Sequence, residues 1–253
     1  MLSFTERGGG PALVFIHAFP LDSSMWHAQV EFFSERYRVV TPDIIGFGGS
    51  QPPHKWTMAE MGDELLSLLN HLEIERCTVI GLSLGGYIAL PFALAHPERI
   101  EDLVLAHTRA RADNENERTA RNSMIDGLQK EGIATLPDKL LPRLLGSGAG
   151  PEARSRVRAS IERVSTDAAV HALTAMRDRT DQTQNLKGLH CPTLVMASSG
   201  DAILPVEDCE RMAAEIPGGD FTLITNTGHL SNLEDPVAFN DALDLFLRRY
   251  DSE

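Results

Sequence analysis

Six short runs of mostly apolar residues recur along the chain, and segments with helical periodicity lie between them. The runs occupy residues 12–17, 38–42, 77–81, 103–107, 192–197 and 221–225. Strands that are apolar almost throughout are typical of a parallel sheet covered by helices on both faces. The alternation of strands and helices therefore predicts an α/β fold with a mostly parallel central sheet flanked by helices.

Two of the intervening segments have clear helical signals. In the first, Thr57 and Glu60 form a capping-box pattern, and apolar residues follow on one face of the predicted helix. In the second, Pro236 occupies the first turn, where its missing N–H costs nothing. The two apolar stripes are Met61, Leu65, Leu68, Leu69 and Leu72, and Phe239, Leu243, Phe246 and Leu247.

The alternation stops between residues 109 and 186, where helical patterns occur without a strand pattern. The charge differs there too: residues 109–185 hold 13 Lys and Arg against 11 Asp and Glu, a net of +2. Since the whole chain has a net charge of −13, the remainder has −15. We predict a helical cap or lid at residues 109–186, inserted between two parts of one core domain, residues 1–108 and 187–253.

Composition excludes several classes of partner. An acidic chain repels nucleic-acid phosphates and anionic lipid, so neither nucleic acid nor a membrane surface is expected as a partner. The three cysteines have no metal-ligand spacing and are expected to be free thiols. The N-terminal residues lack a signal-peptide pattern and no apolar stretch is long enough to span a bilayer, so we expect a cytoplasmic protein. The sequence contains no signal for an oligomeric state.

Residues 81–85, GLSLG, fit the pattern G-x-S-x-G between a strand-like run and a helical pattern. This is the context of a nucleophile elbow, in which a serine occupies a sharp strand-to-helix turn with its hydroxyl exposed. Ser83 is therefore the candidate nucleophile. The alternative is a glycine-rich turn that only connects a strand to a helix.

A serine hydroxyl needs a base at neutral pH. His229 follows the last apolar run through a short polar loop, and Asp201 follows the run at 192–197. Loops at the carboxyl ends of parallel strands are where sites form, and the chain order Ser, Asp, His matches the elbow. We predict His229 as general base and Asp201 as the residue that orients it. The alternatives are a surface histidine and a turn-capping aspartate.

The oxyanion of an attacked carbonyl needs preorganised N–H donors. The first predicted donor is the backbone N–H of Leu84, directly after the nucleophile. The second is the N–H of Phe19, in the loop after the first apolar run, because Pro20 has no N–H to donate.

These motifs resemble those of the α/β-hydrolase superfamily over nearly the whole chain. The segments that match are HAFP at 17–20, PDIIGFGGS at 42–50, GLSLGG at 81–86, GDAILP at 200–205 and GH at 228–229. Residues 19–26, 211–217 and 228–240 are most similar to compact esterases and lactonases of the 3-oxoadipate enol-lactonase-like group. Two positions depart from the pattern: Ala18 replaces the usual glycine, and Pro91 lies within the predicted elbow helix.

Other candidate residues have weaker patterns. Trp26 would line the pocket beside Phe19 or form the apolar face of the first helix. Arg109 would bind a substrate carboxylate, or it would belong to a solvated helical surface with internal ion pairs. The glycines at 46–49 lack dinucleotide-loop spacing and predict a turn. We expect no metal and no cofactor.

The motifs together predict a serine hydrolase that cleaves a small carboxylic ester or lactone through an acyl-enzyme intermediate. One alternative is cofactor-free perhydrolase, carbon–carbon hydrolase or lyase chemistry on the same three residues. Others are a ligand receptor of hydrolase fold that does not turn over, and an interaction domain with a vestigial site.

Overall fold

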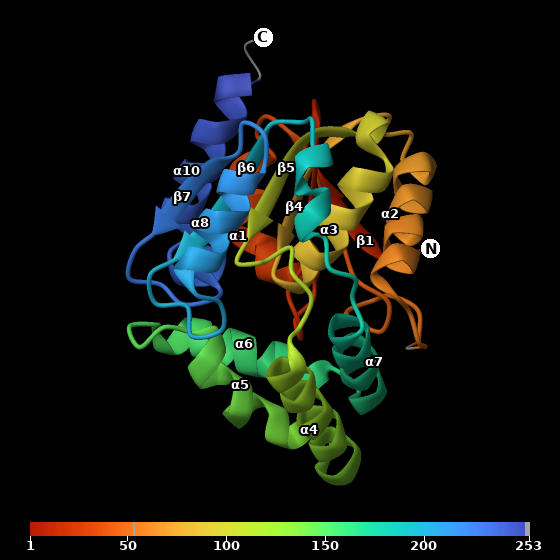
Figure 1. Cartoon of the computed structure of the whole chain (residues 1–253), viewed down its shortest axis with the longest axis vertical. Helices are drawn as coiled ribbons and strands as arrows, with labels where there is room; N and C mark the ends of the chain where they lie inside the picture. The colour runs from red at the N-terminus through yellow and green to blue at the C-terminus, as the bar shows by residue number, and fades with distance from the viewer. Residues whose placement is uncertain (53, 251–253) are drawn as a thin grey trace.

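The computed structural model describes residues 1–52 and 54–250, and a seven-stranded sheet forms its centre (Figure 1). The strand order is β1-β3-β2-β4-β5-β6-β7, and every neighbouring pair is parallel except β1 and β3. The strands are β1 (Phe4–Arg7), β2 (Ala12–Ile16), β3 (Arg38–Pro42), β4 (Cys77–Leu82), β5 (Ile100–Ala106), β6 (Thr193–Ser198) and β7 (Asp220–Ile224). The predicted α/β fold with a mostly parallel sheet is confirmed.

All six predicted strands are present, with ends that differ by a few residues. The apolar pattern did not identify β1, because three of its four residues are exposed and only Phe4 is apolar. This strand pairs antiparallel with β3 at the edge of the sheet, where its other side has no strand partner among the described residues. Edge strands need few apolar residues, so periodicity detects them poorly.

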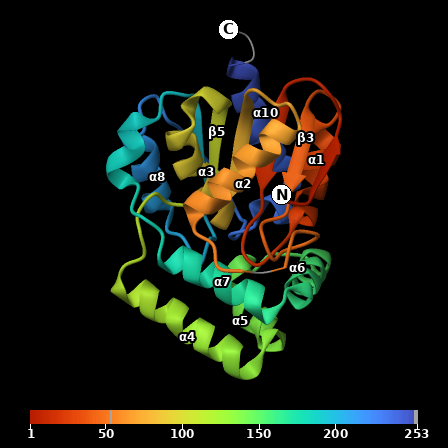
Figure 2. The ribbon, with the colours of Figure 1, turned by 90° about the vertical axis from the view of Figure 1, so that its right-hand side faces the viewer.

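Helices cover both faces of the sheet (Figure 2). One face packs against α2 (Met58–His71), α3 (Leu84–Ala95) and α8 (Val206–Glu215), and the other against α1 (His27–Phe33) and α10 (Pro236–Tyr250). Every residue of β2, β4 and β6 is buried as a result. The strand runs are apolar throughout because neither face reaches water.

Four helices between β5 and β6 lie together at one end of the sheet (Figure 1). They are α4 (Glu115–Glu131), α5 (Leu136–Leu144), α6 (Pro151–Arg163) and α7 (Thr166–Arg177), named here the four-helix segment. A further short helix, α9 (Ser231–Glu234), precedes α10, and 3₁₀ turns occupy Ser23–Trp26, Pro97–Arg99, Ile133–Thr135 and Thr183–Gly188. Within the described ranges, no helix has the length and apolar character that crossing a bilayer requires.

The capping box predicted at the start of α2 is present. The Glu60 N–H donates to Thr57 Oγ1 at 3.2 Å and the Thr57 N–H donates to Glu60 Oε2 at 2.6 Å, which closes the capping box of α2. Met61, Leu65 and Leu68 are buried on its inner face. Pro91 lies inside α3, which continues to Ala95.

Thr57→Ala is expected to destabilise the protein by about 1 kcal/mol, because the first turn of α2 loses the acceptor for an otherwise unpaired N–H. Urea unfolding followed by circular dichroism measures the change. Ser67→Ala on the exposed face of the same helix is the control and should change stability by at most a few tenths of a kcal/mol. Equal effects of the two substitutions would contradict the role of the cap.

Candidate active site

Ser83 occupies the sharp turn between β4 and α3, with φ 56° and ψ −110°. A positive φ is strained for a residue with a side chain, so the surrounding structure must hold it. Two bonds do so: the Ser83 N–H donates to the Ala106 carbonyl at 2.9 Å, and Thr108 Oγ1 donates to the Ser83 carbonyl at 3.0 Å. The turn is therefore anchored to the end of β5.

Close backbone contacts below the turn explain the two glycines that flank Ser83. A Cβ at Gly81 would lie 2.4 Å from the Gly85 carbonyl oxygen, and a Cβ at Gly85 would lie 2.1 Å from the Ile16 carbonyl oxygen. Neither position has room for a methyl group. The start of α3 thus sits directly against β2, and the turn projects Ser83 beyond the sheet.

Asp201 follows β6 in a tight turn, and its side chain is almost fully buried. Oδ1 accepts the N–H groups of Ile203 and Leu204 at 2.8 and 3.0 Å, while Oδ2 lies 2.7 Å from Nδ1 of His229. Burial raises the pKa of Asp201, but the charge of His229 and the histidine hydrogen bonds outweigh it and hold the pKa well below its usual range. The carboxylate is therefore ionised and orients the ring of His229.

His229 lies in the loop after β7, and backbone bonds fix the loop on both sides of it. The Gly228 N–H donates to Glu234 Oε1 at 2.9 Å, and the Leu230 N–H donates to the Leu144 carbonyl at 3.1 Å. With Nδ1–H directed at Asp201, Nε2 of His229 is the atom available to accept a proton.

A cavity of about 160 Å³ is lined by both Ser83 and His229. Phe19 from the loop after β2 and Leu140, Leu144 and Leu173 from the four-helix segment also line it. A larger hollow of about 610 Å³ shares Tyr87 and Arg109 with this cavity but touches neither Ser83 nor His229. The smaller cavity is therefore the candidate active site.

The predicted oxyanion donors lie on the two segments that flank Ser83. Leu84 is the first residue of α3, so its N–H has no partner within the helix. The Phe19 loop is held by His17, whose Nε2 accepts the Ile44 N–H at 2.9 Å and whose Nδ1 lies 3.0 Å from the Ala18 carbonyl oxygen. Burial lowers the pKa of His17, which favours the neutral ring that both bonds require.

The two weaker pocket candidates, Trp26 and Arg109, differ in their surroundings. Trp26 is fully buried, packs against Phe15 and Phe239 with ring centroids 5.0 and 5.9 Å apart, and does not line the cavity. Arg109 does line the cavity, but its guanidinium is occupied by Asp113 at 3.3 Å and Glu117 at 2.8 Å.

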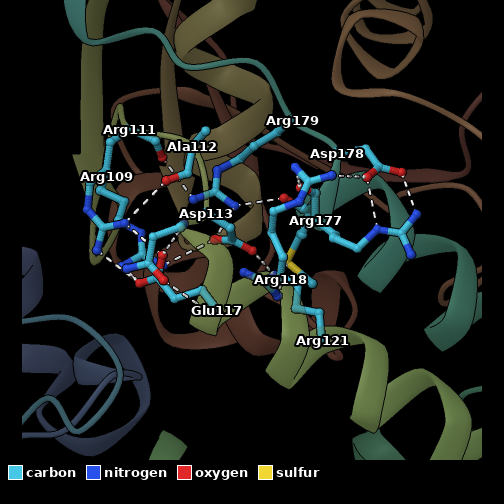
Figure 3. Close-up of polar contacts among 12 residues, drawn as sticks. Arg109, Arg111, Ala112, Asp113, Glu117, Arg118, Arg121, Arg177, Asp178 and Arg179 are labelled. Carbon is cyan, nitrogen blue, oxygen red and sulfur yellow. Dashed lines mark hydrogen bonds and ion pairs between the residues drawn. The ribbon is translucent and has the colours of Figure 1, made fainter.

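Arg109 belongs to a buried ion-pair network at the base of the four-helix segment (Figure 3). Asp113 is fully buried and also pairs with Arg121 and, at 2.7 Å, with Arg179. Glu117 pairs in addition with Arg111 at 2.7 Å. The network joins the segment after β5 to α4 and to Arg179, just beyond α7, and each of its arginines pairs with at least one carboxylate.

Three residues near the site have no distinctive sequence pattern. Arg143 of α5 lines the cavity and makes no ion pair or hydrogen bond with any residue that the structure describes. Glu234 bridges the Gly228 and Gly146 amides, and burial raises its pKa. His107 ends the run at 103–107, and only its position next to Asp201 in space distinguishes it.

Three side chains of metal-ligating types gather at the site. Within residues 1–52 and 54–250, His107, Asp201 and His229 form the one group whose ligand atoms lie close enough to share a metal ion, within 4.8 Å of one another. The 2.7 Å contact between His229 and Asp201 already occupies the space between two of these atoms. The group therefore fits proton transfer better than metal binding.

Comparison with known proteins identifies the fold family of the chain. The sequence model of the family described as alpha/beta hydrolase fold matches residues 11–236. A thermophilic esterase from Thermogutta terrifontis, solved with malate bound, is 36% identical, with a TM-score of 0.95 over 98% of this chain and 93% of the esterase. The enol-lactonase of Burkholderia xenovorans is 26% identical, with a TM-score of 0.91 over 98% of this chain and 96% of that chain.

A relative found by sequence comparison is about as similar to this chain as the Burkholderia enol-lactonase. The 3-oxoadipate enol-lactonase 2 of Acinetobacter baylyi is 26% identical over 244 residues, which are 95% of this chain and 90% of the relative. The resemblance to the enol-lactonase-like group, predicted from the motifs, is confirmed.

Glu117→Gln is expected to destabilise the protein at pH 7 and to have progressively less effect as the pH falls. The hydrogen bond from Arg111 lowers the pKa of Glu117 to about 2, despite partial burial. Its contribution is complete above the unfolded pKa of about 4.5 and disappears as the pH falls through the folded value. Thermal unfolding of both proteins between pH 7 and pH 2 measures the difference.

The control is Glu210→Gln, at an exposed position on α8, which should leave the pH dependence of unfolding unchanged. If the loss of stability caused by Glu117→Gln stays constant down to pH 2, the charge of the Glu117 carboxylate does not stabilise the protein.

Proposed function

Because the chain belongs to the α/β-hydrolase fold family, we propose that it hydrolyses a small carboxylic ester or lactone through an acyl-enzyme on Ser83. The observation that supports this most directly is that Ser83 and His229 line one small cavity while His229 contacts the buried carboxylate of Asp201. An esterase and two enol-lactonases are among the similar proteins.

In the proposed first half-reaction, Nε2 of His229 takes the proton of the Ser83 hydroxyl as its oxygen attacks the substrate carbonyl carbon. The imidazolium that forms is stabilised by ionised Asp201. The N–H groups of Phe19 and Leu84 hold the negative oxygen of the tetrahedral intermediate. The carbon–oxygen bond then breaks, and His229 gives its proton to the departing alkoxide.

In the second half-reaction, His229 removes a proton from water, and the resulting hydroxide attacks the acyl-enzyme. The second tetrahedral intermediate collapses, Ser83 leaves with the proton from His229, and the carboxylic acid is released. For a lactone, the alcohol and the acid are two ends of one product. No step requires a cofactor.

The size and lining of the cavity favour a small substrate. A volume of about 160 Å³ lies below the roughly 300–1,000 Å³ of pockets for drug-sized ligands. Leu140, Leu144 and Leu173 supply an apolar wall for the acyl chain. The four-helix segment thus acts as the cap that selects the substrate, and residues 109–186 form that cap in our proposal.

Ser83→Ala is expected to reduce the turnover of p-nitrophenyl acetate by up to about a million-fold, because the covalent pathway is lost. Spectrophotometric detection of p-nitrophenol measures it, and circular dichroism checks the fold. A single stoichiometric burst by the wild type would indicate a receptor instead. Wild-type turnover that survives in Ser83→Ala would contradict the proposal.

We also propose that the substrate has a carboxylate, which Arg143 binds. Arg143 lines the cavity with a guanidinium that pairs with none of the described residues, whereas Arg109 is held by two carboxylates. A planar guanidinium binds a carboxylate through two hydrogen bonds.

Arg143→Ala should reduce kcat/KM about tenfold or more for an ester with a free carboxylate and leave a neutral ester of similar size unaffected, since hydrogen bonds to charged groups are worth about 1.5–3 kcal/mol. Arg109→Ala is the matched comparison and should affect both esters equally, because it disrupts the ion-pair network. Steady-state kinetics on the two esters decide between Arg143 and Arg109, and equal losses in Arg143→Ala would refute its role.

A further inference from the structure

A second histidine lies against the carboxylate that orients His229. His107 directly follows β5 and is buried, and its backbone has a positive φ of 48°. A residue that has a side chain is strained at a positive φ. The surrounding structure must therefore hold His107 in this conformation. Its ring centroid lies 5.7 Å from that of His229.

Both nitrogens of His107 face specific groups. Nε2 lies 2.6 Å from Oγ of Ser231, a buried hydroxyl at the start of α9. Nδ1 lies 3.4 Å from Oδ2 of Asp201, the same oxygen that Nδ1 of His229 contacts at 2.7 Å. Among the described residues, no group lies in hydrogen-bond geometry with Nδ1 of His107, so its 3.4 Å contact with Asp201 is electrostatic.

The contacts determine the protonation of the ring. Burial lowers the pKa of His107, although Asp201 opposes this, so the ring is neutral. An ionised Asp201 can only accept, which places the single ring proton on Nδ1 and leaves Nε2 to accept the hydroxyl proton of Ser231. Ser231, His107 and Asp201 therefore repeat, at the same carboxylate oxygen, the arrangement proposed for Ser83, His229 and Asp201.

We propose that His107 is a positioning residue that shares Oδ2 of Asp201 with His229 and thereby limits the basicity of the general base. This inference rests on the proposed function. A donor on Asp201 draws negative charge away from the oxygen that stabilises the His229 imidazolium. Without that donor, the imidazolium becomes more stable, and His229 keeps its proton to higher pH.

The neighbouring elements contribute few other titratable groups. Glu234 of α9 binds the Gly228 and Gly146 amides, and its charge interacts with Asp201. Cys209 of α8 donates to the Thr108 carbonyl at 3.6 Å, and burial raises its pKa to about 12, so it stays neutral. Neither group replaces a donor to Oδ2 of Asp201.

Two polar substitutions test the proposal because they place an amide N–H at different ring positions. The side-chain N–H₂ of Asn falls near Nδ1 of the original ring and can still donate to Asp201. That of Gln falls near Nε2 and reaches Ser231 instead. His107→Phe keeps the ring volume and removes both polar atoms.

The measurement is the titration of the His229 imidazole by NMR in protein labelled with ¹⁵N-histidine, together with the pH profile of kcat/KM for p-nitrophenyl acetate. We expect His107→Gln and His107→Phe to move the His229 midpoint and the acid limb upward by about 0.5 pH units or more. His107→Asn should remain within about 0.2 units of the wild type. His190→Phe, at an exposed position, is the control and should change neither readout.

A midpoint in His107→Gln that equals the wild-type value would overturn the proposal, as would a shift in His107→Asn as large as that in His107→Gln. Since both are polar substitutions at one site, loss of packing alone would affect them alike. The NMR titration needs no turnover, so it decides the role of His107 even if Ser83→Ala refutes the hydrolase proposal.

Discussion

The buried carboxylate of Asp201 imposes the strictest constraint on this molecule. A charge removed from water is stable only if hydrogen bonds and opposite charge surround it. Two backbone amides from its own turn and the ring of His229 meet this need, and His107 faces the same oxygen. The ends of β5, β6 and β7 must therefore converge on one point, which is a property of the sheet as a whole.

The second constraint is the contact between backbones beneath Ser83. Gly85 brings the first turn of α3 against the Ile16 carbonyl, so the elbow has one position relative to β2. The loop after β2 contains Phe19, and His17 ties that loop to Ile44. The strained turn and the loop beside it are thus positioned by the same few backbone contacts, which lets a rigid core present a serine without any contribution from the four-helix segment.

The four-helix segment has a different role from the core. The arginines around Asp113 and Glu117 hold the segment together internally, and ion pairs of Arg163 with Asp22 at 2.8 Å and of Arg111 with Asp208 at 3.3 Å connect it to the core. Arg143 is exposed, lines the cavity and has no such pair among the described residues, so its charge does not hold the segment in place.

Sequence alone determined the six main strands, the cap of α2, the start of α10 and the elbow at Ser83, because each depends on burial or hydrogen bonding within a few neighbouring residues. It also identified Asp201 and His229 as residues at strand ends. Only the tertiary structure decided that Trp26 packs in the core, that Arg109 is occupied by carboxylates, and that His107 lies against Asp201. Those facts depend on contacts between side chains that are far apart in the sequence. The pattern of apolar and polar residues along the chain reports burial and local hydrogen bonding, and it does not say which distant side chains come into contact.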